Sequence, residues 1–221
     1  MTDPHIGTLN EGSLHAALKS HYAEPGDEFE VPLDRFVIDI RRGDRLIEIQ
    51  TTALAAMGHK LDHLLPSYHI LIVHPIPIRT RLQRPEKSPR RSPKKLTIYN
   101  LFDELVGLPT LLDHPNLTID ICLVEVTKVQ VAEPKARRGR GGFRTVDRVL
   151  DELIATEHFE TTDDLRRLIP EALPATFTTA DLADGAAIRR DVAQRMAYCF
   201  RALGIFEELG RDRSGIQYRV S

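Results

Sequence analysis

The sequence has no tryptophan, only two cysteines, and just 6% aromatic residues among its 221 positions. Cys122 and Cys199 are isolated and far apart in the chain, which excludes a disulfide framework and gives no support to a cysteine-based zinc site. No apolar run approaches the roughly 20 residues that a membrane-spanning helix needs, and no signal peptide is evident. We therefore expect a cytoplasmic protein that has no membrane partner.

An excess of charge of one sign is also missing, because 30 basic residues face 32 acidic ones. The net charge therefore says nothing about a nucleic-acid partner, but its distribution does. Lysine and arginine gather in segments 79–95 and 134–144, where prolines or glycines predict surface loops. Clustered cations bind phosphates, so we expect DNA as the partner. The candidate DNA contacts are Arg90, Arg91, Lys94, Lys95, Arg137, Arg138 and Arg140, joined by Arg41, Arg42, Arg189, Arg190 and Arg195.

The first part of the chain alternates between helical and strand patterns. Helical spacing occurs at 11–22 and 53–65, and residues 36–52 predict a hairpin with a turn at the sequence RRGD. A short strand is expected at 29–31, and residues 68–78 form the continuous apolar run of a buried strand. This order predicts an α/β layer in which helices cover a sheet.

The remainder of the chain predicts one more helix and strand, followed by a largely helical unit that ends in a hairpin. This order of a short helix, a longer helix and a small hairpin is that of a winged helix-turn-helix. The division that we expect is a first domain at 1–133, a basic linker at 134–144 and a winged-helix domain at 145–221. The individual elements are helices at 96–114, 146–156, 161–173 and 187–206, a strand at 117–131, a hairpin at 206–220, and a helix N-cap at Thr178 or Thr179.

The hairpin at 36–52 carries polar residues on strands that otherwise resemble core. Asp39 interrupts the run FVIDI, and Glu48 and Gln50 interrupt LIEIQ. A buried carboxylate is costly unless it is paired or bound to a metal. Glu48 and Gln50 share one strand face, and Asp39 on the neighbouring strand can share it too. Two such carboxylates predict a site for Mg²⁺ or Mn²⁺; the alternative is a half-exposed strand whose polar residues face water.

These residues resemble the core of the PD-(D/E)xK nuclease superfamily over about residues 8–78. In that pattern Glu11 takes the helix position, Asp39 the strand position, and Glu48 with Gln50 the E-x-Q variant. The sequence departs from the commoner pattern at Ile38, where proline is frequent, and at Gln50, where lysine is frequent. Lys60 on the next predicted helix can supply the missing cation. Over its whole length the chain also resembles an uncharacterised bacterial family that joins such a core to a C-terminal winged helix.

The resemblance implies a restriction-endonuclease-like αβββαβ core with a mixed sheet, and metal-dependent hydrolysis of DNA. Asp39 and Glu48 would ligate Mg²⁺ or Mn²⁺, with Glu11 supporting the ion through water. Gln50 would position water or phosphate, and Lys60 would stabilise developing charge. The alternative is a non-catalytic DNA-binding or regulatory protein that keeps this fold and uses its winged helix. The sequence is compatible with a homodimer.

Overall fold

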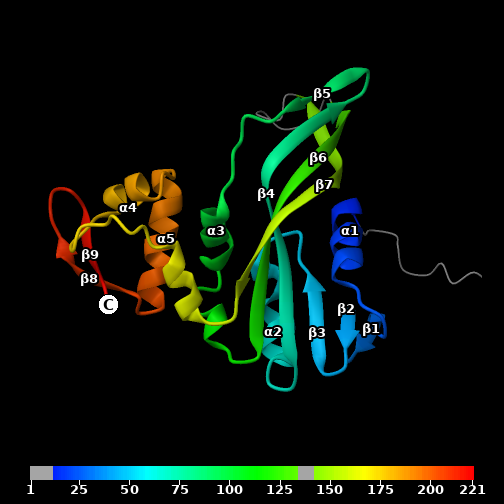
Figure 1. Ribbon diagram of the computed structural model, residues 1–221, viewed down its shortest axis with the longest axis horizontal. Coiled ribbons are helices and arrows are strands. Elements are labelled where there is room, and N and C mark those ends of the chain that lie inside the picture. The colour runs from blue at the N-terminus through cyan, green and yellow to red at the C-terminus, as the bar shows by residue number, and fades with distance from the viewer. Residues whose placement is uncertain (1–11, 134–141) are drawn as a thin grey trace, which may run out of the picture.

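The computed structural model describes residues 12–133 and 142–221, and within them a seven-stranded mixed sheet forms the centre (Figure 1). Its strands run in the order β1-β2-β3-β4-β6-β7, with β5 pairing onto β4. The β3–β4 and β4–β6 pairs are parallel and the other pairs are antiparallel, which confirms the mixed α/β class. The strands are β1 (Glu28–Leu33), β2 (Phe36–Arg42), β3 (Arg45–Ile49), β4 (His69–Arg84), β5 (Lys87–Arg91), β6 (Leu117–Ala132) and β7 (Phe143–Phe159).

Helices cover both faces of the sheet, so each face encloses apolar side chains. On one face α1 packs Leu14 and Leu18 against residues such as Ile47, because these leucines lie one helical turn apart. On the other face, leucines of α2 and α3 pack against the sheet in a larger cluster. The elements are α1 (Ser13–Tyr22), α2 (Gly58–Leu64), α3 (Leu101–Leu105) and the short 3-10 helices η1 (Leu54–Met57), η2 (Ile98–Asn100) and η3 (Leu111–Asp113).

The basic segment 79–95, which the sequence predicts as a loop, is mostly strand. β4 continues to Arg84, and β5 turns back to pair with it, so a hairpin projects from the sheet (Figure 1). The charged residues and prolines of this segment suggest a loop, but β5 is exposed along its whole length. An exposed edge strand tolerates both kinds of residue. Arg84 stacks on the ring of Phe143 at 3.9 Å, which joins this hairpin to the start of β7.

The predicted helix at 146–156 is wrong, because these residues belong to β7. This strand pairs with β6 from Phe143 to Phe159, so the sheet continues beyond residue 145, where the sequence predicts the start of a helical domain. Three irregularities in the β6–β7 register shift the alternation of side chains. The resulting apolar spacing resembles that of a helix, although Val146 and Val149 are exposed on the strand.

The chain after β7 forms helices and a separate two-stranded hairpin, as the sequence predicts. The expected helix at 161–173 is only the short helix η4, which ends before Pro170 because the residue before a proline avoids helical geometry. Thr178 is the expected N-cap, and its hydroxyl accepts hydrogen bonds from the backbone of Ala180 and Asp181. Phe177 forms an isolated bridge with Tyr218 of the hairpin. The elements are η4 (Thr162–Leu168), α4 (Thr179–Gly185), α5 (Arg190–Ala202), β8 (Phe206–Arg211) and β9 (Ile216–Val220).

This C-terminal unit packs against α3 rather than standing apart from the sheet. Phe200 of α5 meets Phe102 of α3 edge to face, with ring centroids 5.1 Å apart. Arg195 donates to Asp103 Oδ1 at 2.9 Å across the same contact. Among the described helices, none is both long and apolar enough to cross a membrane.

Candidate active site

The candidate site lies where β2 and β3 separate. Their register ends with the pair Ile40–Ile47, and Asp39 and Glu48 come next on the two strands. The two acids lie on facing strands, and the negative charge of Asp39 raises the pKa of Glu48, so their carboxyl groups are close enough to act on each other. The Asp39 carboxylate replaces the missing backbone pairing, because its Oδ2 accepts a hydrogen bond from Ile49 N at 2.8 Å.

Glu48 is a buried carboxylate that is only partly neutralised. It is 8% exposed, and Lys60 Nζ of α2 lies 2.6 Å from its Oε1. That approach lies outside hydrogen-bond geometry, so Oε1 is a buried oxygen without a hydrogen bond in the described part of the chain. Lys60 Nζ instead donates to Val37 O at 2.7 Å. Burial raises the pKa of Glu48 to about 7, although the nearby Lys60 charge opposes the shift.

The pKa of Asp39 is shifted in the opposite direction, below its ordinary value. Burial disfavours its ionised form, but hydrogen bonds from His15 and from Ile49 N, together with the charge of Lys60, outweigh burial and lower its pKa. His15 Nε2 of α1 lies 3.3 Å from Asp39 Oδ2. Two neighbouring carboxyl groups with pKa values displaced in opposite directions are typical of catalytic sites. His15 was missed in the sequence, although it lies four residues after Glu11 on the same predicted helix.

The other predicted site residues take different places. The side-chain amide of Gln50 donates to Ala53 O at 2.8 Å and so is held by the loop after β3. Lys60 is the residue that meets Glu48. Glu11 lies outside the described residues. Within 12–133 and 142–221, no three or more His, Cys, Asp or Glu side chains are grouped so that they could hold a metal ion.

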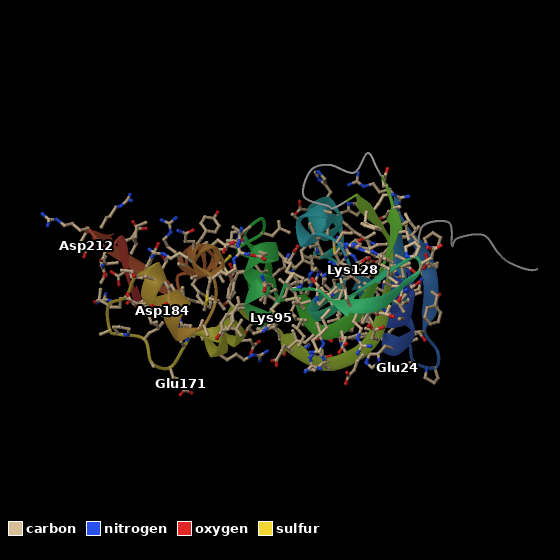
Figure 2. The ribbon with its side chains drawn as sticks, turned by 90° about the horizontal axis from the view of Figure 1, so that it is seen from above. Glu24, Lys95, Lys128, Glu171, Asp184 and Asp212 are labelled. Atoms are coloured by element: carbon tan, nitrogen blue, oxygen red, sulfur yellow. The ribbon has the colours of Figure 1, made fainter. Side chains whose placement is uncertain are left out.

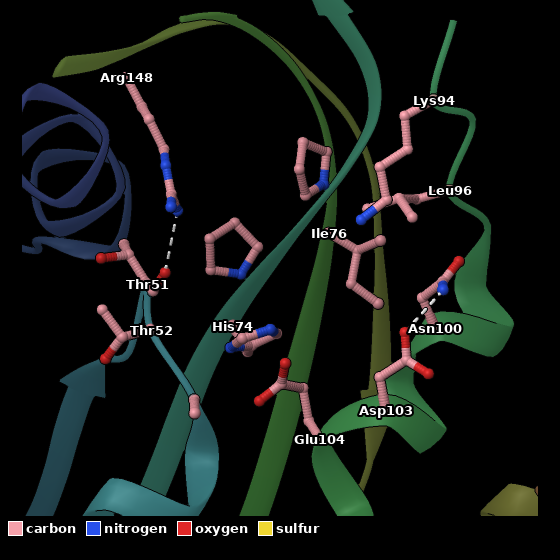
Figure 3. A pocket seen from close by; sticks show the side chains of 13 residues that line it. Thr51, Thr52, His74, Ile76, Lys94, Leu96, Asn100, Asp103, Glu104 and Arg148 are labelled. Atoms are coloured by element: carbon pink, nitrogen blue, oxygen red, sulfur yellow. Dashed lines mark hydrogen bonds between the residues drawn. The ribbon is translucent and has the colours of Figure 1, made fainter. Parts of the chain in front are cut away.

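A pocket of about 290 Å³ opens beside this site, between the loop after β3, strand β4 and helix α3 (Figure 3). His74 lies at its base, 6% exposed, and its Nδ1 donates to Gln50 O at 2.8 Å. Burial lowers the pKa of His74 even though Glu104 lies nearby, which keeps the imidazole neutral at neutral pH. No sequence pattern predicts this pocket, since its walls come from segments distant in the chain.

The predicted DNA-binding cations fall into two groups. Some are held in ion pairs: Arg42 contacts Asp27 and Glu24, and Arg189 contacts Asp191. Among the described residues, Arg90, Arg91, Lys94 and Lys95 form no such pair. The two arginines lie at the end of β5, and the two lysines lie in the segment after it. Arg190 is exposed at the start of α5, and Arg41 Nε donates only to Gly43 O. Arg137, Arg138 and Arg140 lie outside the described residues.

Comparison with known proteins identifies relatives but no chemistry. The sequence profile of the family described as "Domain of unknown function (DUF8091)" matches residues 12–160. That range includes the whole seven-stranded sheet and stops one residue after β7. An "Uncharacterized protein" of Treponema pallidum (strain Nichols) is 31% identical over 184 residues, covering 80% of this chain and 73% of that protein. No solved structure matches.

Proposed function

The chain belongs to the DUF8091 family, and from the geometry of its site we propose that it is a metal-dependent nuclease acting on DNA. The observation that carries this proposal is the meeting of Asp39, Glu48 and Lys60 where β2 and β3 separate. The order α1, β1 to β3, α2 and β4, with β4 parallel to β3, supports an assignment to the PD-(D/E)xK arrangement.

The donor set of this site suits a divalent metal ion. Mg²⁺ is usually held by one or two carboxylates, with water and substrate oxygens completing its coordination. Glu48 Oε1 is a buried carboxyl oxygen that accepts no hydrogen bond from the described residues, and Asp39 is the next residue on the facing strand. Asp39 and Glu48 would hold the ion, which when bound activates water and offsets charge developing on the phosphate.

The protein's own groups would orient the site and supply charge. His15 and Ile49 N fix the Asp39 carboxylate from two directions. Lys60 already offsets part of the charge of Glu48 from 2.6 Å, and its ammonium group would contact a phosphate bound beside that carboxylate. The hydrogen bond from Lys60 to Val37 O keeps that ammonium beside the site. Lys60 would thus stabilise developing charge from α2, the role that the resemblance gives to the more common lysine at the Gln50 position of the strand.

The C-terminal unit supports a second candidate function, non-catalytic DNA binding or regulation. We propose that η4, α4, α5 and the β8–β9 hairpin are a winged helix, because the bridge between Phe177 and Tyr218 joins the hairpin to the segment before α4. Arg190, Gln194 and Tyr198 are exposed along one side of α5, as a helix that enters a DNA groove requires. This alternative is favoured by the Gln50 side chain, which is bonded to Ala53 O.

Metal-dependent cleavage tests the proposal directly. We expect supercoiled and linear DNA to be cleaved with Mg²⁺ or Mn²⁺ and to remain intact with Ca²⁺ or a chelator. Asp39→Asn and Glu48→Gln should each lower the rate about 100-fold or more, since each replaces a charged ligand with a neutral one of the same shape. The matched control is Asp44→Asn, which removes an exposed carboxylate from the turn of the same hairpin.

Gln50→Lys restores the commoner superfamily residue, and a working site should tolerate it or gain rate. Cleavage that is indifferent to Asp39→Asn and Glu48→Gln would contradict the nuclease proposal. The absence of metal-dependent cleavage of any DNA or RNA, together with retained DNA binding, would favour the regulatory alternative.

A further inference from the structure

Lys94 and Arg148 line the His74 pocket and Lys128 lies next to Arg148, and among the described residues no carboxylate pairs with any of the three. Lys94 and Arg148 line the pocket from different segments (Figure 3). Lys128 lies directly opposite Arg148 in the register of β6 and β7, and Figure 2 shows it over the sheet layer. Among the ion pairs of the described residues, none involves these three side chains. In the described part of the chain, the Arg148 guanidinium donates to Thr51 O at 3.3 Å.

Nearby cations of β4 and β7 are neutralised by ion pairs. Arg81 lies 2.9 Å from Glu125, and Arg144 lies 2.8 Å from Glu133. The acids that line the same pocket are also engaged. Asp103 pairs with Arg195 at 2.9 Å, and Glu104 Oε2 accepts a hydrogen bond from Leu54 N at 3.0 Å. In the described chain, neither of these acids forms an ion pair with Lys94, Lys128 or Arg148.

The proximity of Lys94, Lys128 and Arg148 costs free energy when no anion is bound between them. Like charges directly opposite each other on paired strands repel. Burial lowers the pKa of Lys128, and the charges of Arg148 and Lys94 lower it further, so the three groups are close enough to act on one another. A fold that keeps such a cluster beside a pocket gains stability when an anion binds there.

We propose that Lys94, Lys128 and Arg148 form a binding site for a phosphate group, carried by a nucleic-acid strand or by a small phosphorylated molecule. The planar guanidinium of Arg148 can contact two phosphate oxygens, and the two lysines add point charges. Thr51 links the site to the candidate active site, because it follows Gln50 at the end of β3 and accepts from Arg148. Binding at this site requires no metal, so the proposal does not depend on hydrolysis at Glu48.

Inorganic phosphate is the first probe, measured by calorimetric titration in chloride buffer of constant ionic strength. The test variant is Lys128→Met with Arg148→Gln, in which methionine keeps the aliphatic stem of the lysine. The control is Arg201→Gln with Arg219→Gln, which removes the same charge from exposed, ion-paired positions of the C-terminal unit. Removing one of the charged groups that hold the phosphate should weaken its binding about tenfold, and the double variant about 100-fold, while the control binds as the native protein does.

Thermal unfolding without phosphate gives a second readout. Removing repulsion should leave the Lys128→Met and Arg148→Gln variant at least as stable as the native protein in chloride, and phosphate should stabilise only the native protein and the control. If the double variant does not fold, Lys128→Met alone should still show the tenfold loss of affinity. Equal phosphate affinity in native, test and control proteins, or no binding by any of them, would overturn the proposal.

A ten-nucleotide single-stranded DNA identifies the source of the phosphate. Loss of its binding in the test variant, with retention in the control, would assign the site to a nucleic-acid strand. Unchanged binding of this DNA, combined with abolished phosphate binding, would assign it to a small phosphorylated molecule. Failure of DNA cleavage with intact phosphate binding would overturn the nuclease proposal and leave the phosphate site in place.

Discussion

At the scale of single residues, Glu48 stands out because an ionisable carboxyl group is buried among apolar side chains. Its neighbours on β3 are core residues, yet it carries a carboxylate that is 8% exposed and has an oxygen without a hydrogen bond. Lys60 offsets part of this cost from α2. Costs of this kind are typical of functional sites, where a group is held in readiness for a ligand rather than for stability.

This cost predicts a pH dependence of stability in the metal-free protein. Because the pKa of Glu48 rises from its usual 4.5 to about 7, the folded state holds a proton that the unfolded state has released between those values. Stability should therefore fall as pH rises through that window and stay lower above it. Glu48→Gln removes the titration, so the variant should be more stable than the native protein at pH 8, by up to about 3 kcal/mol.

Urea unfolding at pH 4 and pH 8 with a chelator measures this difference. The two proteins should be nearly equal at pH 4, where Glu48 is protonated. Asp44→Asn serves as the control, since it removes an exposed carboxylate from the turn of the same hairpin. A Glu48→Gln variant that is less stable than the native protein at pH 8 would show that the Lys60 ion pair outweighs the burial of the carboxylate.

At the scale of elements, the β4–β5 hairpin and the segment after it carry the unpaired cations. Both lie at the end of the sheet where β6 ends and β7 begins, and the stacking of Arg84 on Phe143 holds these two regions together (Figure 1). Pairing with β4 fixes the direction of β5, so its cations belong to a defined surface rather than to a loose linker. Such a surface suits the phosphate backbone of DNA, which binds cations without regard to sequence.

Neutralising this surface should flatten the salt dependence of DNA binding. Replacing Arg90, Arg91, Lys94 and Lys95 with glutamine should reduce the slope of log K against log salt by about 0.9 for each phosphate of duplex DNA that the protein no longer neutralises. Fluorescence anisotropy at several salt concentrations measures the slope. The control replaces four arginines that are already ion-paired, namely Arg144, Arg166, Arg201 and Arg219. An unchanged slope in the first variant would assign the surface to solvation alone.

At the scale of the whole molecule, one apolar cluster connects the sheet to the C-terminal helices. It contains Ile72 of β4, Phe102 of α3, and Phe200 and Phe206 of the C-terminal unit, all fully or almost fully buried. The sequence suggested two domains joined by a basic linker. A shared core instead favours cooperative unfolding, because neither part can unfold without exposing the apolar surface of the other.

Phe200→Ala tests this coupling. Its ring contacts Phe102 and Phe206, so the resulting cavity should lower the free energy of unfolding by about 3–5 kcal/mol. Scanning calorimetry should show a single transition that moves to lower temperature as a whole. Tyr198→Ala is the control on the same helix, since its side chain is 43% exposed and should matter little. Two transitions, of which only one moves, would restore the two-domain division.

The sequence by itself determined the α/β class, both cysteines as isolated residues, the hairpin at 36–52 and the C-terminal hairpin. These features depend on local periodicity and turn residues, which act within a few positions of the chain. The sequence also singled out Asp39 and Glu48, because a carboxylate in an apolar strand is chemically conspicuous, and the family resemblance added Lys60; their role as a site stays a prediction. Local reasoning failed at β7, where shifts in register change the side-chain spacing, and at β5, where an exposed strand has the composition of a loop.

Only the tertiary structure decided which of these residues meet. The parting of β2 and β3 brings Asp39 to Ile49 N, and packing of α2 brings Lys60 to Glu48 while Gln50 bonds to Ala53 O. The pairing of β6 with β7 places Lys128 opposite Arg148, although 20 positions separate them in the sequence. Such contacts depend on strand register and helix packing across the whole sheet, and no local pattern in the chain specifies either of them.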